Sequence, residues 1–207
     1  MSHYAITITR QFGSLGRPIA KKLSERLGIE YYDRDIVEQV AKETGLSVKT
    51  ISNEEESAKN RFFRMMFPLG GPDTTVIQDH IFEVQKGIIQ DLAKKEDCII
   101  VGRCSDYVLR HHENCMNIYI YAEMDQRMKN CVNILHLEPQ TAKRMIRDVD
   151  KARDSYHIRY AGYYPNDENH QDIMIDSGFL GVDGTAEVLE AIVRKKLEIG
   201  DNPDMTD

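Results

Sequence analysis

Residues 4–17 read Tyr-Ala-Ile-Thr-Ile-Thr-Arg-Gln-Phe-Gly-Ser-Leu-Gly-Arg, and they lead directly into a helix-like run at residues 18–23. The first six residues predict a short apolar strand, and the two glycines that follow predict a turn. In a strand–turn–helix unit of this kind, backbone N–H groups converge and the helix dipole favours an anion. The stretch therefore predicts a phosphate-binding turn at the start of the first helix.

The turn is a variant of the P-loop, whose usual pattern is G-x-x-x-x-G-K-[ST]. Gly16 stands where the pattern has its lysine, and Pro18 takes the place of the Ser or Thr that would hold Mg²⁺. Gly13 and Gly16 allow the backbone to approach a phosphate closely, and Ser14 can add a hydroxyl donor. Arg17 has a planar fork that can grip phosphate oxygens, so we expect it to take over part of the role of the missing lysine.

Composition bounds the class of protein. The chain has 207 residues, of which 41% are hydrophobic and 29% charged, which is typical of a soluble globular domain. Its formal net charge of −7 argues against a nucleic-acid polymer as the main partner. No apolar run approaches the roughly 18 residues of a membrane span, and no signal-peptide pattern is present. The cysteines form no C-x-x-C pair, so we expect idle thiols in a reducing cytoplasm rather than a zinc site.

Strand and helix signals alternate along most of the chain, which predicts an α/β fold around a parallel sheet. Five strands are expected, at residues 4–9, 29–32, 98–101, 116–121 and 172–176. Helices are expected at residues 17–27, 35–44, 76–94, 124–135, 139–159 and 185–199. Residues 65–75 contain two prolines and two glycines and are expected to form a loop.

Further motifs follow these strands in a fixed order. They are Tyr31-Tyr32-Asp33, Ile99-Ile100-Val101-Gly102-Arg103, Asp150-Lys151-Ala152-Arg153 with Tyr156, and Asp172-Ile173-Met174-Ile175 with Gly181 and Val182. Together with residues 4–18, this series resembles the cytidylate kinase-like family of P-loop nucleoside-monophosphate kinases, and the likeness covers nearly the whole chain. Each motif is weak alone, but five in the same order are specific.

The resemblance implies a three-layer P-loop NTPase fold, with a five-stranded parallel sheet of order 2-3-1-4-5 and helices on both faces. It implies one domain at residues 1–200, with an acceptor-binding segment and insert at about 34–95, a lid at about 139–165 and a frayed tail at 201–207. ATP and Mg²⁺ are the implied cofactors and nucleotides the implied substrates, whereas a homodimer is left open. The resemblance places the ATP phosphates at Gly13, Ser14, Leu15, Gly16 and Arg17.

The acceptor site is implied by residues that follow two strands. The resemblance gives Arg103 the contact with the acceptor phosphate, with Gly102 leaving room for the ligand. Asp106, three residues further on, is a candidate for orienting Arg103 or for recognising the base. Asp33 lies at the carboxyl edge of the sheet, where it would line the acceptor site or cap a helix. The family segment Asp-Ser-Gly reads Asp33-Arg34-Asp35 here, and a family arginine aligns near Gln39. Recognition of the acceptor is therefore expected to differ in detail.

Cations of the expected lid are the implied catalytic residues, because phosphoryl transfer depends on charge placed on the phosphate oxygens. Arg153 is the first candidate, Lys151 the second and Arg159 a third. Asp150 is expected to hold one of these cations or a Mg²⁺-bound water. Tyr156 is expected to stack on a base or to pack.

The sequence thus indicates an ATP-dependent kinase whose acceptor is a nucleoside monophosphate, with CMP or dCMP favoured. Two alternatives stay open. One is a kinase of the same fold with another small acceptor, indicated by Arg34, Gln39 and the insert at residues 47–75. The other is a nucleotide-binding regulatory protein without turnover, indicated by the loss of the P-loop lysine and Ser/Thr. The cations kept in the lid favour an enzyme.

Overall fold

The computed structural model describes residues 3–33 and 72–197. The helix expected at residues 35–44, and Arg34, Asp35 and Gln39, lie outside the described residues. The expectations about the insert at residues 47–75 also fall outside them, except at its last four positions.

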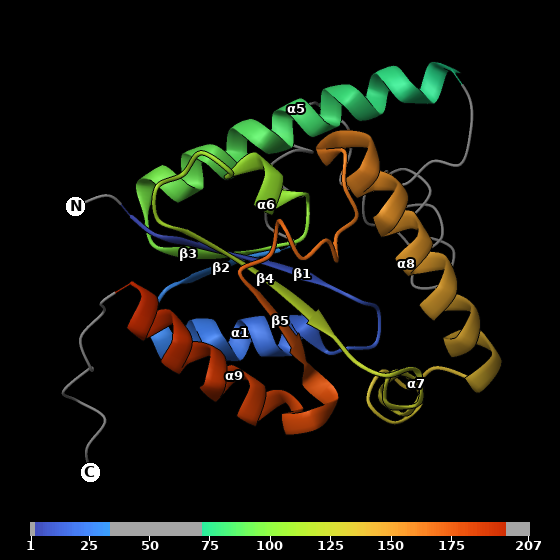
Figure 1. The fold of residues 1–207 in the computed structure, drawn as a ribbon. Coiled ribbons are helices and arrows are strands. Elements are labelled where there is room, and N and C mark those ends of the chain that lie inside the picture. The colour runs from blue at the N-terminus through green and yellow to red at the C-terminus, as the bar shows by residue number, and fades with distance from the viewer. Residues whose placement is uncertain (1–2, 34–71, 198–207) are drawn as a thin grey trace, which may run out of the picture.

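The sheet has five parallel strands in the order β2-β3-β1-β4-β5, which confirms the predicted topology (Figure 1). The strands are β1 at Ala5–Arg10, β2 at Glu30–Tyr32, β3 at Cys98–Val101, β4 at Cys115–Tyr121 and β5 at Ile173–Asp176. Because every pair is parallel, all five carboxyl ends lie at one edge, where ligands of open α/β sheets bind.

Helices cover both faces of the sheet (Figure 1). On one face lie α1 at Gly16–Leu27 and α9 at Ser177–Lys196. On the other lie α5 at Pro72–Lys95 and α6 at Ser105–Val108. The remaining helices, α7 at Met124–Asn133 and α8 at Pro139–Ala161, stand beside the carboxyl edge of the sheet. The fold is therefore the three-layer arrangement predicted from the sequence.

The core explains why β3 is apolar at every position. Ile99 and Val101 face α1 and α9, whereas Cys98 and Ile100 face α5 and α6, and all four are fully buried. Alternate side chains of a strand point to opposite faces, so a strand with helices on both sides has no solvent-facing position. The strands that end at the carboxyl edge are therefore held in place by side-chain packing on both faces of the sheet.

Three local expectations were wrong. The loop expected at residues 65–75 ends earlier, because α5 begins at Pro72, a residue suited to a first helical turn. The last helix begins at Ser177 rather than residue 185. Asp176 caps it by accepting the N–H of Gly178 at 2.8 Å, and Gly181, with φ 68°, kinks it. The short helix α6 was not predicted.

Candidate active site

The turn between β1 and α1 is organised by its own backbone. The Ser14 hydroxyl is fully buried and donates to the carbonyl oxygens of Gln11 at 2.9 Å and Ile120 at 3.2 Å. This hydroxyl therefore anchors the turn to β4 in the free protein, and its expected contact with a ligand phosphate stays a prediction. Leu15 is left-handed, with φ 59°, and α1 begins at the next residue. The first N–H groups of α1 thus point out of the turn, as an anion site requires.

Side chains from α7 and α8 hold the turn from behind. Arg127 Nε donates to the carbonyl oxygen of Phe12, and Asn130 Nδ2 donates to that of Gly13, each at 2.8 Å. The carboxylate of Asp150 accepts the N–H of Phe12 at 2.7 Å and forms an ion pair with Arg127. Gly13 has φ +82°, and a Cβ there would lie 3.0 Å from the carbonyl oxygen of Arg127. Asp150 is thus a support of the turn, and its approach to Arg153 is longer, at 3.8 Å.

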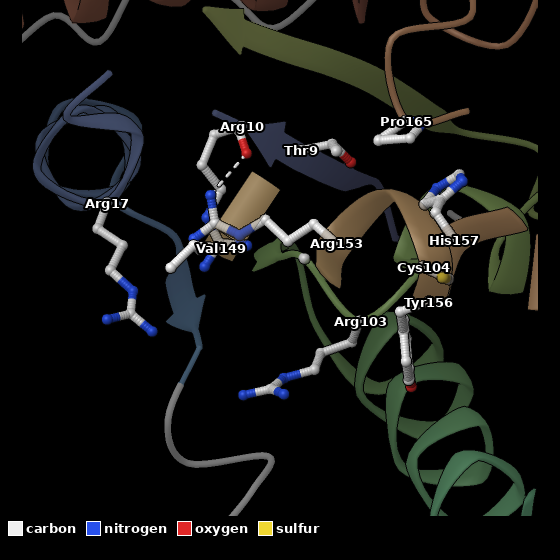
Figure 2. Close-up of a pocket in the computed structure, with 11 residues that line it drawn as sticks. Thr9, Arg10, Arg17, Arg103, Cys104, Val149, Arg153, Tyr156, His157 and Pro165 are labelled. Carbon is white, nitrogen blue, oxygen red and sulfur yellow. Dashed lines mark hydrogen bonds between the residues drawn. The ribbon is translucent and has the colours of Figure 1, made fainter. Parts of the chain in front are cut away.

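Four arginines gather in front of the turn. Figure 2 shows them entering one pocket from different elements: Arg10 from β1, Arg17 from α1, Arg103 from the segment after β3 and Arg153 from α8. The pocket has a volume of about 150 Å³. Nη1 of Arg153 donates to the backbone oxygen of Arg10 at 2.9 Å, which fixes α8 to the end of β1.

The carboxylate of Asp33 partly neutralises this cluster. Asp33, 5% exposed, lies with Oδ2 2.5 Å from Nε of Arg17 and Oδ1 3.7 Å from Nη2 of Arg10. Burial lowers the pKa of Arg10, and the nearby charge of Arg153 lowers it further. Burial also lowers the pKa of Arg103, and that of Arg153 to about 10. Arginine side chains stay charged in proteins at neutral pH, so the pocket favours an anion with more than one charge.

A second cavity, of about 390 Å³, adjoins the first on the side of the turn. Its walls are residues 10–13 and 15–18 together with Leu135, Leu137 and Met145. Both cavities are lined by Arg10, Arg17, Val149 and Arg153. The arginines therefore lie where a larger, partly apolar cavity meets a smaller one.

Arg103 is aimed into the smaller cavity by a strained backbone. Gly102, Arg103 and Cys104 are all left-handed, with φ 74°, 64° and 51°, and the Ser105 N–H closes the turn on the Gly102 oxygen at 3.1 Å. Such a conformation is unfavourable for residues other than glycine, and it is typical of functional sites. A Cβ on Gly102 would collide with Nη1 of Arg10. Gly102 thus makes room for Arg10, and because it also lines the smaller cavity, its expected role in leaving room for a ligand stays a prediction.

Other predicted site residues lie elsewhere. Lys151 is exposed on α8 and lines neither cavity. Arg159 forms a bidentate ion pair with Asp79 at 2.8 and 2.9 Å. Tyr156 lines the smaller cavity, and its hydroxyl lies 3.1 Å from Oε1 of Gln85.

Asp106 lies beneath the smaller cavity, fully buried. Its carboxylate accepts hydrogen bonds from His157 at 3.0 Å, Tyr163 at 3.1 Å and Gln171 at 3.3 Å. Burial lowers the pKa of His157, but the hydrogen bond and charge of Asp106 outweigh it and raise that pKa above its usual value. In the structure Asp106 thus holds α8 to α6, and its expected contact with Arg103 or a base stays a prediction.

Sequence reasoning missed three of these residues. Arg10 belongs to the quoted stretch, and its place at the carboxyl end of a strand is a signal that could have identified it. Arg127 and His157 carry no such signal, because their roles depend on how α7 and α8 pack. The part of the chain that the structure describes contains no cluster of three metal-ligating side chains and no helix long and apolar enough to cross a membrane.

Comparisons with known proteins agree with this fold. The family model of the cytidylate kinase-like family matches residues 5–178. An uncharacterized protein from Eubacterium ventriosum ATCC 27560 is 25% identical, with a TM-score of 0.71 over 92% of this chain and 98% of that one. A search of curated proteins found no match.

Two more distant solved structures are similar to this chain in fold, and at their low sequence identity the likeness is evidence for the fold only. TT1252 from Thermus thermophilus is 12% identical, with a TM-score of 0.59 over 97% of this chain and 100% of that one. Shikimate kinase from Bacteroides thetaiotaomicron is 11% identical, with a TM-score of 0.55 over 95% of this chain and 99% of that one.

Proposed function

The chain belongs to the cytidylate kinase-like family, and we propose that it transfers the γ-phosphoryl group of ATP to a nucleoside monophosphate, CMP or dCMP. Family and fold support phosphoryl transfer of the nucleotide-kinase type. The observation that carries the proposal is the meeting of two cavities at a wall of arginines. A donor on one side and an acceptor on the other would present their phosphates to each other at that wall.

The larger cavity suits the donor. The first N–H groups of α1 and the side chain of Arg17 would bind the phosphates of ATP. Leu135, Leu137 and Met145 supply an apolar wall on which an adenine ring could pack. Pro18 cannot coordinate a metal, so Mg²⁺ would be held by the nucleotide phosphates and waters, where it neutralises charge on the phosphate oxygens.

The smaller cavity suits the acceptor. Arg103 projects into it and would bind the acceptor phosphate as a bidentate pair. Asp33 lies at the carboxyl end of β2 beside the same arginines, so it can order the cations or accept a hydrogen bond from the acceptor. Tyr156 lies in the wall beyond Arg103, within reach of a base.

The reaction then depends on the positions of the two phosphates and on positive charge beside the transferring group. An oxygen of the acceptor phosphate attacks the γ-phosphorus, the bond to the β–γ bridging oxygen breaks, and ADP leaves. The acceptor oxygen is already ionised, so no general base is required. Arg153 lines both cavities and would stabilise the charge of the transferring group, while Val149 helps to exclude water.

The proposal is tested by ADP formation from MgATP with CMP, dCMP, UMP, AMP and GMP, in the wild type and in Arg153→Ala. Arg147→Ala is the matched control, because Arg147 is an exposed arginine of the same helix, paired with Asp148. Turnover with CMP or dCMP that collapses only in Arg153→Ala is the expected result. Turnover with UMP, AMP or GMP instead would assign a different acceptor. The absence of turnover with all five monophosphates would overturn the proposal.

A further inference from the structure

Arg10 has an unusual environment for a buried cation. Its side chain is 11% exposed, and its Nε is buried without a hydrogen-bond partner among the residues that the structure describes. A buried donor left unpaired is costly, and more so when the group is charged. The side chain nevertheless lines both cavities.

Two backbone turns leave space for this side chain. A Cβ on Gly16 would lie 2.8 Å from the Cβ of Arg10, and a Cβ on Gly102 would collide with its Nη1. Gly16 begins α1, whereas Gly102 follows β3, so the space is made by segments far apart in sequence. The fold therefore accommodates the arginine beside two glycines, and a Cβ at either position would have to displace its side chain.

The surrounding charge is unbalanced. Asp33 is the described carboxylate that pairs with Arg10, at 3.7 Å, but its shorter contact of 2.5 Å is with Arg17. Arg153 and Arg103 add further positive charge beside it. Arg17 is 59% exposed and already paired with Asp33, whereas Arg10 is buried and has only the longer contact with that carboxylate. Within residues 3–33 and 72–197, the chemistry around Arg10 therefore favours an anion as a further partner.

We propose that Arg10, rather than Arg17, takes the place of the P-loop lysine and binds the phosphoryl group where the two cavities meet. In a P-loop that lysine reaches the β- and γ-phosphates. Arg10 lies at the end of β1, on the junction between the cavities, and its planar fork can bind two oxygens of one phosphate. That the anion is a nucleotide phosphate rests on the proposed function.

Binding of inorganic tripolyphosphate, measured by calorimetry, tests this role without a nucleoside. Arg10→Met keeps the bulk of the side chain and removes the charge, and Arg147→Met is the control on the exposed face of α8. Loss of a charge-assisted contact predicts binding roughly tenfold to a hundredfold weaker in Arg10→Met and unchanged in the control. Unchanged binding in Arg10→Met would overturn the proposal.

Thermal unfolding of the free protein separates this role from a structural one. Arg10→Met should melt at or above the wild-type temperature, because it relieves repulsion among buried cations. A lower melting temperature together with unchanged tripolyphosphate binding would show a merely structural residue. Should Arg10→Met not fold, Arg10→Gln decides by the same binding measurement. If Arg10→Met loses tripolyphosphate binding while the wild type turns over none of the monophosphates, Arg10 remains the anion ligand and the proposed function is rejected.

Discussion

Arg17 and Asp33 form an ion pair across the front of the arginine cluster, with Nε of Arg17 2.5 Å from Oδ2 of Asp33. The two residues come from different elements, since Arg17 lies in the first turn of α1 and Asp33 follows β2. Arg17 Nη2 also donates to Oδ1 of Asp33 at 3.3 Å. The carboxylate therefore occupies a position that an incoming phosphate would compete for.

Asp33→Asn should strengthen the binding of tripolyphosphate by about threefold to tenfold, because it removes a competing negative charge from the cluster. Calorimetry at constant ionic strength measures the effect. Asp183→Asn serves as the control, because Asp183 is an exposed carboxylate that pairs with Lys22 and lines neither cavity. Weaker binding in Asp33→Asn would show instead that Asp33 is needed to order Arg17.

Arg153 and Lys151 should differ sharply although they are two residues apart on α8. Arg153→Ala should lower kcat by about 10²- to 10³-fold, because the transferring phosphoryl group loses a positioned cation. Lys151→Ala should change kcat by less than about threefold. Lys151 is exposed and lines neither cavity, so solvent and salt screen its charge from the reacting phosphates. Steady-state kinetics with a saturating acceptor distinguish the two, and equal losses would contradict this assignment.

The fold was predictable because its signals are repeated and local. The apolar runs at Cys98–Val101 and Cys115–Tyr121 need no partner information to be recognised as buried strands. The order of the strands came from the resemblance, not from the spacing of residues. The kink at Gly181 was missed because the glycine adopts φ 68° inside a segment that is helical on both sides.

The site was less predictable, because side chains choose their partners in three dimensions. Ser14 has a hydroxyl that could donate a hydrogen bond to a phosphate, but in the structure this hydroxyl donates to the carbonyl oxygen of Ile120 on β4. Asp106 is three residues from Arg103, yet α8 brings His157 to its carboxylate. Both contacts join residues 51 or more positions apart, which no local pattern reveals.

The ion pair between Arg127 and Asp150 should contribute to the stability of the folded protein. Arg127→Met breaks a largely buried ion pair and leaves Asp150 only the longer contact with Arg153, so we expect the free energy of unfolding to fall by about 3 kcal/mol. Because Arg127 Nε also holds the carbonyl oxygen of Phe12, the KM for ATP should rise. Urea unfolding and ATP-dependent kinetics measure the two effects.

The exposed pair Arg147–Asp148 on the same helix supplies the comparison. Arg147→Met should change the free energy of unfolding by less than about 1 kcal/mol, as is usual for surface ion pairs. Similar losses for the two arginines would mean that the Arg127–Asp150 pair does not stabilise the turn.

His157 should make the stability of the protein depend on pH. Its Nδ1 lies 3.0 Å from the carbonyl oxygen of Tyr163 and its Nε2 3.0 Å from both carboxylate oxygens of Asp106. Both partners accept hydrogen bonds, so the doubly protonated ring fits this site. The Asp106 interactions raise the pKa of His157 in spite of its burial, and Asp154 adds to the rise.

A histidine whose pKa is higher in the folded state stabilises that state fully below the unfolded pKa of about 6.5. This contribution is lost as pH rises through the raised folded pKa. We therefore expect the free energy of unfolding, measured with urea at a series of pH values, to fall with rising pH across this window. His157→Gln should be less stable by about 3 kcal/mol at pH 6, because Asp106 loses its buried cation, and should lose much of the slope. His111→Gln, at an exposed turn, should keep the wild-type slope, and equal slopes in His157→Gln and the wild type would show that His157 is neutral in the fold.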